Sequence, residues 1–202
     1  MDLKTIAANQ LKPIATGQET TLGDLWKNED CVIVFFRRWG CTFCRLWAKE
    51  ISEIAPILKK HNIKLIGVGV DDIGKEEFTN GKFFDGDLYI AGEKKTYSTL
   101  GFKRFSYMSI MAALLWKESR EAVSKSRKLS LGGDLKGDGL QNGGALIVGK
   151  GGNLLTHFIQ NGPAEHMSNS AILKALKLEN ELSNLKSEEA DIVTSEGECK
   201  RT

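Results

Sequence analysis

The sequence predicts an α/β domain in which two parallel strands, joined by a long helix, are followed by an antiparallel hairpin. Two apolar runs rich in β-branched residues, Cys31–Phe36 and Lys64–Val70, indicate buried strands on either side of a segment with helical spacing. Apolar residues on both sides of Gly149–Asn153 indicate the hairpin, because glycine and asparagine favour its tight turn. With 202 residues, the chain is long enough for one well-buried core and too short for two ordinary domains.

The composition is that of a globular protein with little net charge. Hydrophobic residues make up 41% of the chain, and 28 Lys and Arg against 26 Asp and Glu leave a net charge of +2, which argues against nucleic-acid binding. The N-terminus lacks the basic start and apolar core of a secretory signal. The longest nearly apolar run, Met108–Trp116, is far shorter than the roughly 20 residues of a membrane-spanning helix. We therefore expect a cytosolic protein with no nucleic-acid partner and no membrane span.

The first half of the chain is expected to hold an N-terminal extension and a β-α-β unit. Turn residues divide residues 10–30 into short mixed segments, which is typical of an extension leading into a core. Residues 41–61 carry apolar side chains at helical spacing, namely Leu46, Trp47, Ile51, Ile54, Ile57 and Leu58. Pro56 lies late in this segment and is expected to kink the helix. A strand, a helix and a strand in close succession predict parallel pairing with a right-handed crossover.

The second half of the chain completes the pattern. It predicts short helices at residues 71–80 and 93–100, a short strand at 88–90, a helix at 108–129 and a glycine-rich loop at 132–144. After the hairpin, a closing amphipathic helix is marked by Ile172, Leu173, Leu176 and Leu178. This order is that of the thioredoxin fold, with an N-terminal extension and a helical insertion before the C-terminal β-hairpin. We expect this domain at residues 1–180 and a disordered acidic, Ser-rich tail at residues 181–202.

The pair Cys41-Thr-Phe-Cys44 stands between the first buried strand and the long helix. Cys41 is expected near the N-cap and Cys44 one turn inside, so that both thiols share one face at a separation that a disulfide tolerates. The closed loop is short, so the disulfide gains little from chain entropy and is easily reduced. The helix dipole and the charges of Arg37, Arg38 and Arg45 around this turn favour a reactive thiolate. These features indicate redox cycling.

Other roles for these residue types are less favoured by the sequence. A Cys-x-x-Cys pair is also half of a zinc site, but no second pair or His-x-x-x-His completes one, so we expect no metal. Cys31 opens a buried strand and is expected to be core filler. His157 is the histidine best placed for proton transfer, although a packed or surface histidine is the commoner case.

The apolar start of the inserted helix offers a second candidate for function. Met108, Met111 and Leu115 are candidates for a cover over an apolar substrate, because methionine-rich surfaces adapt to flexible ligands. The competing interpretation is that these residues pack the insertion onto the core. The glycines of residues 132–144 match no phosphate-binding or dinucleotide motif, so we expect no tightly bound cofactor.

Several sequence stretches together resemble a known family. These are Arg37–Arg45 with its Arg-Arg-Trp-Gly-Cys-Thr-Phe-Cys-Arg sequence, Gly67–Gly69, Leu100–Arg104, Gly137–Gln141 and Leu146–Gly152. The chain is similar to the peroxiredoxin-like 2 proteins over roughly residues 11–178, and most similar to those that act on prostaglandin endoperoxides. The resemblance implies reduction of prostaglandin H2 and prostamide H2 to their F2α products, with NADPH as the ultimate reductant. It carries over two catalytic positions, Cys41 and Cys44.

The same resemblance leaves the attacking cysteine open. Thioredoxins imply attack by Cys41 and resolution by Cys44, whereas peroxiredoxins imply the reverse. We favour Cys41, because the start of the helix is the more exposed position. Asn142-Gly143-Gly144 stands where thioredoxins place a cis-proline, and the Pro-x-x-x-Thr-x-x-Cys of ordinary peroxiredoxins is incomplete. These departures favour a small organic peroxide over protein disulfides or hydrogen peroxide.

The electron donor and the competing functions follow from the same residues. Without a nucleotide motif, NADPH is expected to deliver electrons indirectly, through a thioredoxin-type partner. A general thioredoxin-like dithiol reductase or peroxidase is the alternative enzyme. A non-catalytic, redox-regulated interaction protein is the alternative of another class.

Overall fold

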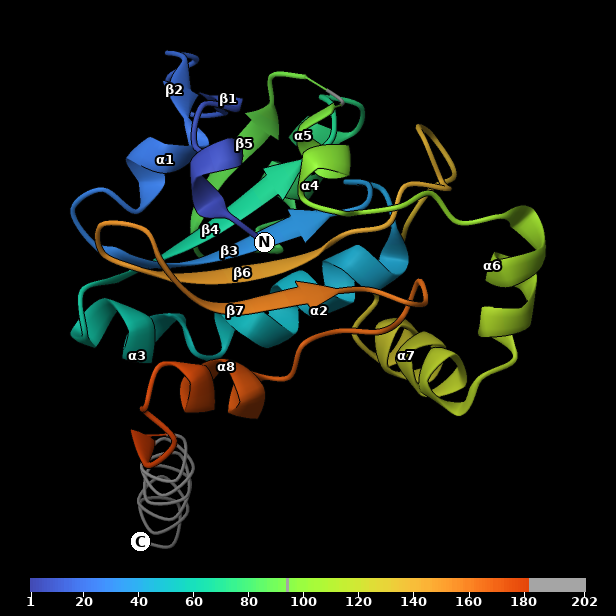
Figure 1. Ribbon diagram of the computed structural model, residues 1–202. Coiled ribbons are helices and arrows are strands. Elements are labelled where there is room, and N and C mark those ends of the chain that lie inside the picture. The colour runs from blue at the N-terminus through green and yellow to red at the C-terminus, as the bar shows by residue number, and fades with distance from the viewer. Residues whose placement is uncertain (94, 182–202) are drawn as a thin grey trace, which may run out of the picture.

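A seven-stranded sheet runs through the centre of the molecule with helices on both faces (Figure 1). The computed structural model describes residues 1–93 and 95–181. The strands follow the spatial order β2-β1-β5-β4-β3-β6-β7. Their bounds are β1 (Gln10–Pro13), β2 (Thr20–Thr21), β3 (Asp30–Phe36), β4 (Ile63–Gly69), β5 (Asp87–Ala91), β6 (Gly144–Gly149) and β7 (Asn153–Ile159).

The central strands are the two apolar runs that the sequence predicts to be buried. β3 and β4 pair in parallel, and β5 continues the parallel arrangement beside β4. β6 is antiparallel to β3 and to β7, which confirms the hairpin around residues 149–153. Residues 31–36 are all buried, because helices cover both sides of β3 and only a strand that is apolar on both faces suits that position.

Helices from different parts of the chain cover the two faces of the sheet. One core contains Phe36, Trp47 and Ile172 and is covered by α2 (Thr42–Ser52), α3 (Ala55–Lys60), α4 (Lys75–Asn80) and α8 (Asn169–Ala175). The other core contains Ile6, Phe35 and Tyr97 and is covered by a 3-10 turn η1 (Leu3–Thr5), α1 (Leu22–Leu25) and α5 (Lys95–Thr99). The predicted thioredoxin-like layering is therefore present.

Two predicted long helices are each divided in the structure. The kink expected at Pro56 is wrong, because this residue lies in the first turn of α3, and α2 ends before it. Proline lacks the N–H that a helix interior needs, but the first turn has no partner for that group. The helix expected at residues 108–129 is likewise two helices, α6 (Tyr107–Leu114) and α7 (Lys117–Lys128), with Trp116 as the N-cap residue of α7.

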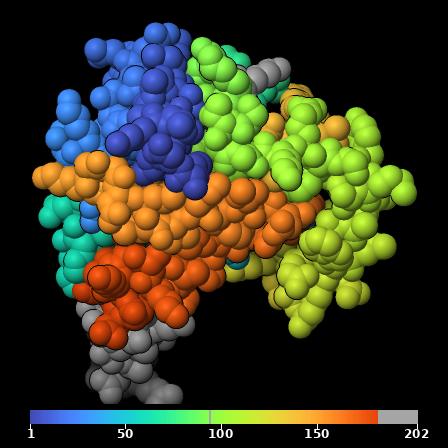
Figure 2. Space-filling view, in the orientation of Figure 1, coloured from blue at the N-terminus to red at the C-terminus, as the bar shows by residue number. Residues whose placement is uncertain are grey.

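The N-terminal extension and the insertion attach to the domain differently. The extension lengthens the sheet, since β1 pairs antiparallel with β5. In the insertion, α7 packs against α2 through a small core of Leu46, Ala122, Leu131 and Ala164. α6 projects from the body beside α7 (Figures 1 and 2). Within the described ranges, no helix is long and apolar enough to cross a bilayer. The predicted tail lies, apart from residue 181, outside the described residues.

Candidate active site

The two cysteines of the pair lie at the carboxyl end of β3, where the chain turns into α2. Cys41 is the N-cap residue of α2, with extended backbone angles and no side-chain capping bond, and Cys44 lies in the first turn. Both are free thiols. Cys41 is 6% exposed and Cys44 is 1% exposed, so Cys41 is the thiol nearer to solvent. The predicted placement of the pair is confirmed.

The surroundings of the pair separate the acidities of the two thiols. Cys44 donates a hydrogen bond to Cys41, and with the charges of Arg37 and Arg38 this holds the pKa of Cys41 well below its usual value, against the effect of burial. Burial raises the pKa of Cys44 well above its usual value, and the hydrogen bond to Cys41 adds to the increase. The state that this arrangement favours is a thiolate at Cys41 beside a neutral thiol at Cys44.

Arg37 is buried with its guanidinium directed at Cys41. Its Nη1 lies 3.8 Å from the Cys41 sulfur. Its remaining N–H groups donate to main-chain carbonyls, with Nε 3.0 Å from the oxygen of Gln141 and Nη2 2.7 Å from that of Gly139. The ring of Phe105 lies 5.3 Å from the guanidinium carbon. In the described part of the chain no carboxylate pairs with Arg37, so its full charge acts on the sulfur.

The glycine-rich loop forms a strap, residues 132–141, that is fastened across the cysteine turn. Arg38 donates to the carbonyls of Asp134 and Lys136, each at 2.9 Å. The hydroxyl of Thr42 donates to the carbonyl of Gly132 at 2.7 Å, and the N–H of Asp134 donates to the carbonyl of residue 40 at 2.8 Å. The strap therefore fixes both arginines and the first residue of α2.

These main-chain partners were not found by sequence reasoning. The loop at residues 132–144 was predicted as a loop, and no chemistry was assigned to it. Every residue has the same main-chain carbonyl, so the amino-acid sequence does not indicate which carbonyls accept these hydrogen bonds. The arginines that donate to them also lie about a hundred positions away in the chain. The available signal was the density of glycine, which lets a backbone approach another closely. At Gly133, where φ is +149°, a Cβ would lie 2.2 Å from the Thr42 hydroxyl oxygen.

A cavity of about 390 Å³ opens beside Cys41, between the start of α2, α7 and the strap. It is lined by Arg38, Cys41, Thr42, Phe43, Val123, Ser126, Arg127, Ser130, Gly132, Asp134 and Leu135. Its walls combine apolar side chains with two guanidinium groups. Arg127 forms no ion pair with any residue that the structure describes, so its charge is available to a ligand.

The predicted substrate cover lies elsewhere on the insertion. Met108, Met111 and Leu115 line no part of this cavity, and they are 82%, 65% and 78% exposed. The competing interpretation, that they pack the insertion onto the core, is wrong, because α6 turns them to solvent. Their role over the substrate stays a prediction. Val123 and Leu135 supply apolar walls next to Cys41, and sequence reasoning did not single them out.

Three other residues named from the sequence have structural surroundings. His157 pairs with Leu146 across β6 and β7 and contacts Phe102, so it lies on the sheet face opposite the cysteines and cannot exchange protons with them directly. Cys31 is buried in β3, and burial raises its pKa to about 12. Arg45 is buried and forms an ion pair with Glu77 at 2.8 Å. Among the described residues, no cluster of His, Cys, Asp and Glu suits a metal ion.

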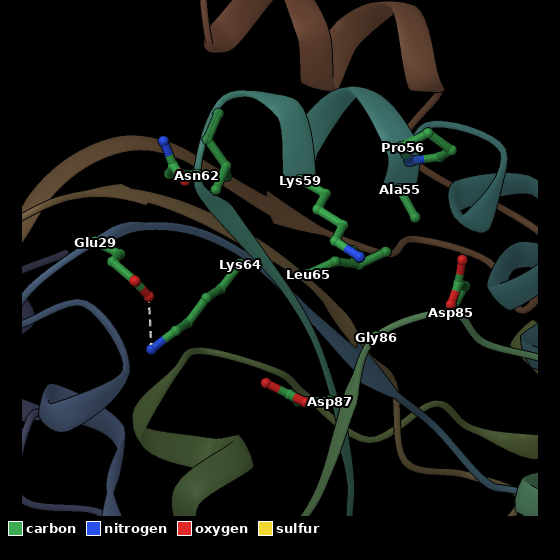
Figure 3. Close-up of a pocket in the computed structure, with 11 residues that line it drawn as sticks. Glu29, Ala55, Pro56, Lys59, Asn62, Lys64, Leu65, Asp85, Gly86 and Asp87 are labelled. Atoms are coloured by element: carbon green, nitrogen blue, oxygen red, sulfur yellow. Dashed lines mark ion pairs between the residues drawn. The ribbon is translucent and has the colours of Figure 1, made fainter.

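A larger hollow, of about 800 Å³, lies at the opposite end of the strands from the cysteines, where β3 and β4 begin (Figure 3). Lys59, Lys64, Asp85 and Asp87 border it, and Glu29 forms an ion pair with Lys64 at 2.7 Å. No thiol or histidine lines this hollow. Of these two cavities, the one beside Cys41 is therefore the candidate for redox chemistry.

Comparison with known proteins places the chain in a family. Residues 50–162 match the AhpC/TSA antioxidant enzyme family, a span that begins just after the cysteine pair. Prostamide/prostaglandin F synthase of Danio rerio is 43% identical over 177 residues, covering 87% of this chain and 88% of the relative. The protein of the same name from Homo sapiens is 39% identical over 183 residues, covering 90% and 92%.

Solved structures of low sequence identity share the fold. Peroxiredoxin Q of Xanthomonas campestris superimposes with a TM-score of 0.53 at 14% identity, covering 88% of this chain and 94% of that one. Peroxidoxin BcpB of Mycobacterium tuberculosis gives 0.52 at 16% identity, covering 85% and 90%. The fold is thus that of thioredoxins and peroxiredoxins. By its identity to curated relatives over most of both chains, the protein is an oxidoreductase of the AhpC/TSA antioxidant-enzyme family, in the peroxiredoxin-like 2 group with the prostamide/prostaglandin F synthases.

Proposed function

We propose that this protein reduces lipid endoperoxides, namely prostaglandin H2 and prostamide H2, to the corresponding F2α diols. The observation that carries the proposal is the low-pKa thiol of Cys41 at the wall of a cavity that is partly apolar and partly cationic. The names of the curated relatives agree with this substrate class. The chemistry divides into two thiol steps.

In the first step the thiolate of Cys41 attacks one oxygen of the strained O–O bond. The O–O bond breaks, a sulfur–oxygen bond forms, and the second oxygen leaves as an alkoxide that takes up a proton. The low pKa of Cys41 supports its role as the nucleophile. The guanidinium of Arg38, which also lines the cavity, is placed to stabilise the negative charge that develops on oxygen.

In the second step the thiol of Cys44 resolves the intermediate. Cys44 loses its proton, attacks the sulfur of Cys41 and expels the first oxygen as a second alkoxide, which is protonated. The product is a diol, because both oxygens stay on the ring, and the protein holds a disulfide. The pair has then supplied two electrons and the proton of Cys44, and the second proton has come from solvent. The high pKa of Cys44 keeps its proton in place until Cys41 is no longer a thiolate.

The lining of the cavity next to Cys41 suits an amphipathic substrate. Phe43, Val123 and Leu135 provide apolar contact for hydrocarbon chains, and Arg127 provides a cation without an acidic partner in the described residues. A prostaglandin ends in a carboxylate, which a guanidinium binds through charge-assisted hydrogen bonds. A prostamide ends in a neutral amide, so the same arginine distinguishes the two substrates by charge.

The disulfide is reduced by an external dithiol, for which we propose a thioredoxin-type donor recharged by NADPH. The strand-to-helix turn that would hold a dinucleotide phosphate is occupied by Cys41. Thiol–disulfide exchange with a donor protein needs only access to one sulfur of the pair, and Cys41 is the more exposed one. The protein itself is proposed to bind no cofactor tightly and to act in the cytosol.

The alternative of a general protein-disulfide reductase is less well supported. Such enzymes bind an extended peptide substrate through main-chain hydrogen bonds next to the cysteines. Here the N–H of Asn142 donates to the carbonyl of Lys103, and the N–H of Gly143 donates to the side chain of Gln160 at 3.1 Å. These donors are already occupied, so the segment before β6 offers little for a peptide to pair with.

A turnover assay with four oxidants tests the proposal. Purified protein, with thioredoxin, thioredoxin reductase and NADPH, is given prostaglandin H2, a linear lipid hydroperoxide, hydrogen peroxide or insulin disulfides. NADPH consumption and products are followed, and the rate without the protein is subtracted because thioredoxin alone reduces insulin. We expect the highest kcat/KM for the endoperoxide, with the F2α diol as product, and no turnover in Cys41→Ser. Preference for hydrogen peroxide or insulin would establish the general reductase instead, and no turnover with any oxidant would leave a redox-regulated interaction protein.

A further inference from the structure

The exposed apolar side chains of the protein are concentrated at one place. Eight of the eleven large hydrophobic residues that are exposed in the described chain lie between residues 107 and 135. Six of these belong to one short stretch, namely Tyr107, Met108, Met111, Leu114, Leu115 and Trp116. Contiguous apolar surface of this kind is unusual for a soluble monomer and marks a site of interaction. We call this stretch, residues 107–116, the α6 face.

The geometry of α6 turns this set outward as a single stripe. Tyr107, Met111 and Leu115 follow one another at intervals of four residues, and Met108 and Leu114 lie beside them on the same side. Trp116 follows the end of the helix and is half exposed, with its ring next to Gly162. On the opposite side, Ala113 is buried and its carbonyl accepts a hydrogen bond from Ser119 at 2.6 Å. The helix thus contacts the body through Ala113, and its large apolar residues are exposed.

The chain around the α6 face is strongly basic. Residues 103–136 contain eight Lys and Arg and three Asp and Glu, whereas the remainder of the protein has more acidic than basic residues. Lys103, Arg120 and Lys128 form no ion pair with any described residue. An apolar helix face in a chain segment rich in cations without ion-pair partners complements a surface that is apolar below and negatively charged above, which describes a bilayer of anionic lipids.

From this juxtaposition we propose that the α6 face docks the protein on anionic membranes without spanning them. Met108, Met111 and Leu115 enter the boundary between headgroups and acyl chains, and Tyr107 and Trp116 lie at the headgroup level, where aromatic rings with a polar atom are favoured. α6 has eight residues, enough to lie in the interface and too few to cross it. α7, the helix that follows the α6 face in the chain, lines the Cys41 cavity, so docking brings the membrane next to the helix that forms a wall of that cavity.

Flotation with lipid vesicles tests this docking without any turnover, so its outcome is independent of the endoperoxide activity. The full-length protein is mixed either with vesicles of phosphatidylcholine that contain about 30% phosphatidylserine or with vesicles of phosphatidylcholine alone. The phosphatidylserine gives the first vesicles a negative surface potential, which attracts basic side chains. We expect binding to the anionic vesicles and a loss of binding at high salt. Arg120→Gln and Lys128→Gln should each weaken it by about fivefold.

The apolar part of the surface is tested with Met108→Ser/Met111→Ser/Leu115→Ser, which should lower the bound fraction at least about tenfold. Leu155→Ser is the matched control, because Leu155 is 41% exposed but lies on β7 outside the α6 face, and it should bind like the wild type. Circular dichroism checks that both variants are folded. Equal flotation on neutral vesicles, undiminished binding of the triple variant, or a dimer in sedimentation that the triple variant abolishes would each overturn membrane docking.

Discussion

At the residue scale, the proposed chemistry depends on two thiols three positions apart, whose pKa values are shifted in opposite directions. The N-cap position gives Cys41 the positive end of α2 and the charge of Arg37, while the first turn of the helix buries Cys44 in the core. A nucleophile needs to be ionised, and a resolving thiol needs to hold its proton until the first step is complete. One Cys-x-x-Cys at the start of one helix meets both requirements.

Replacement of either cysteine should abolish turnover and leave the fold intact. Cys41→Ser puts a good capping residue at the N-cap of α2, and in Cys44→Ser the hydroxyl can donate to a carbonyl of the preceding turn. We expect endoperoxide turnover below about one hundredth of the wild type, with melting temperatures within a few degrees. Cys31→Ala is the control, because this thiol lies on the other face of the sheet, and it should retain activity. Full activity in either variant of the pair would exclude the dithiol mechanism.

The alkylation rate of Cys41 should depend on pH in a way that identifies its activating partners. Its thiolate should be present well below the ordinary thiol pKa of about 8.5, because Cys44 and Arg37 lower the pKa of Cys41. As the pH falls through this lowered pKa the thiolate is protonated, so alkylation and turnover should both decrease there. The rate with iodoacetamide is measured against pH in protein whose Cys31 and Cys199 are replaced by alanine.

Two variants complete this measurement. Cys44→Ala removes the largest cause of the lowered pKa, and Arg37→Gln removes the nearest charge, so each should move the profile to higher pH. Lys49→Gln, on a residue of α2 whose ammonium lies over Phe83, is the control and should leave the profile in place. A profile that stays fixed in Arg37→Gln would contradict the role of this guanidinium.

At the element scale, the strap determines how the arginines are held. Arginine side chains are flexible, so a guanidinium stays directed at one atom only where hydrogen bonds hold its other N–H groups in place. The strap supplies main-chain carbonyls that accept these hydrogen bonds. Because a carbonyl carries no net charge, it does not neutralise the positive charge of the guanidinium. Arg37 and Arg38 both donate to it, so the strap orders the two cations together.

Gly133→Ala should loosen this strap. The φ of +149° is strained for alanine, and its Cβ would lie 2.2 Å from the Thr42 hydroxyl oxygen. We expect unfolding free energy to fall by about 1–3 kcal/mol and the Cys41 alkylation profile to move to higher pH, because the arginines lose their anchors. Urea unfolding and alkylation measure the two effects. Gly151→Ala, at a similarly positive φ of +77° but in the distant β6–β7 turn, should destabilise without changing the profile.

α7 contributes the residue that we expect to select substrates by charge. Arg127→Gln should raise KM for prostaglandin H2 by about tenfold or more, because a charge-assisted contact is worth about 1.5–3 kcal/mol, and it should change KM for prostamide H2 little. Lys128→Gln is the neighbouring control, since Lys128 does not line the cavity, and it should affect neither substrate. Steady-state kinetics with both substrates decide the matter, and equal effects of Arg127→Gln on the two would show that the carboxylate binds elsewhere.

At the scale of the whole molecule, the sheet brings together segments that are far apart in the chain. β3 ends at the cysteines, β6 begins after the strap, and α7 closes the cavity from the insertion. Because β3 lies between β4 and β6, its end is surrounded by structure on both sides. Within the insertion α7 packs against α2, whereas α6 projects from the body and exposes the apolar α6 face.

The complete protein should bind NADPH no more tightly than about millimolar. A nicotinamide nucleotide needs a glycine-rich strand-to-helix turn or an equivalent phosphate site, and at the end of β3 that position holds the N-cap Cys41. Calorimetric titration of the oxidised protein with NADPH should give no saturable heat, whereas reduced thioredoxin should reduce the Cys41–Cys44 disulfide directly. A saturable site with micromolar affinity, or sustained turnover with NADPH alone, would contradict the indirect route.

The sequence by itself determined the features that depend on neighbouring residues. The buried strands, the hairpin and the position of Cys41 at the start of α2 follow from local periodicity, turn composition and spacing, and each is present in the structure. The division of the helix near Pro56 was within reach of the same local rules, since proline at a first turn is as regular as a kink.

Only the tertiary structure decided which distant groups meet the cysteine pair. Arg37 reaches the carbonyls of Gly139 and Gln141, more than a hundred residues later, and α7 rather than α6 forms the wall of the cavity. The physical reason is that such contacts depend on chain reversals and on backbone atoms that are the same in every residue. A periodic pattern reports which side of a helix is apolar, but the α6 face shows that it does not report whether that side will be covered.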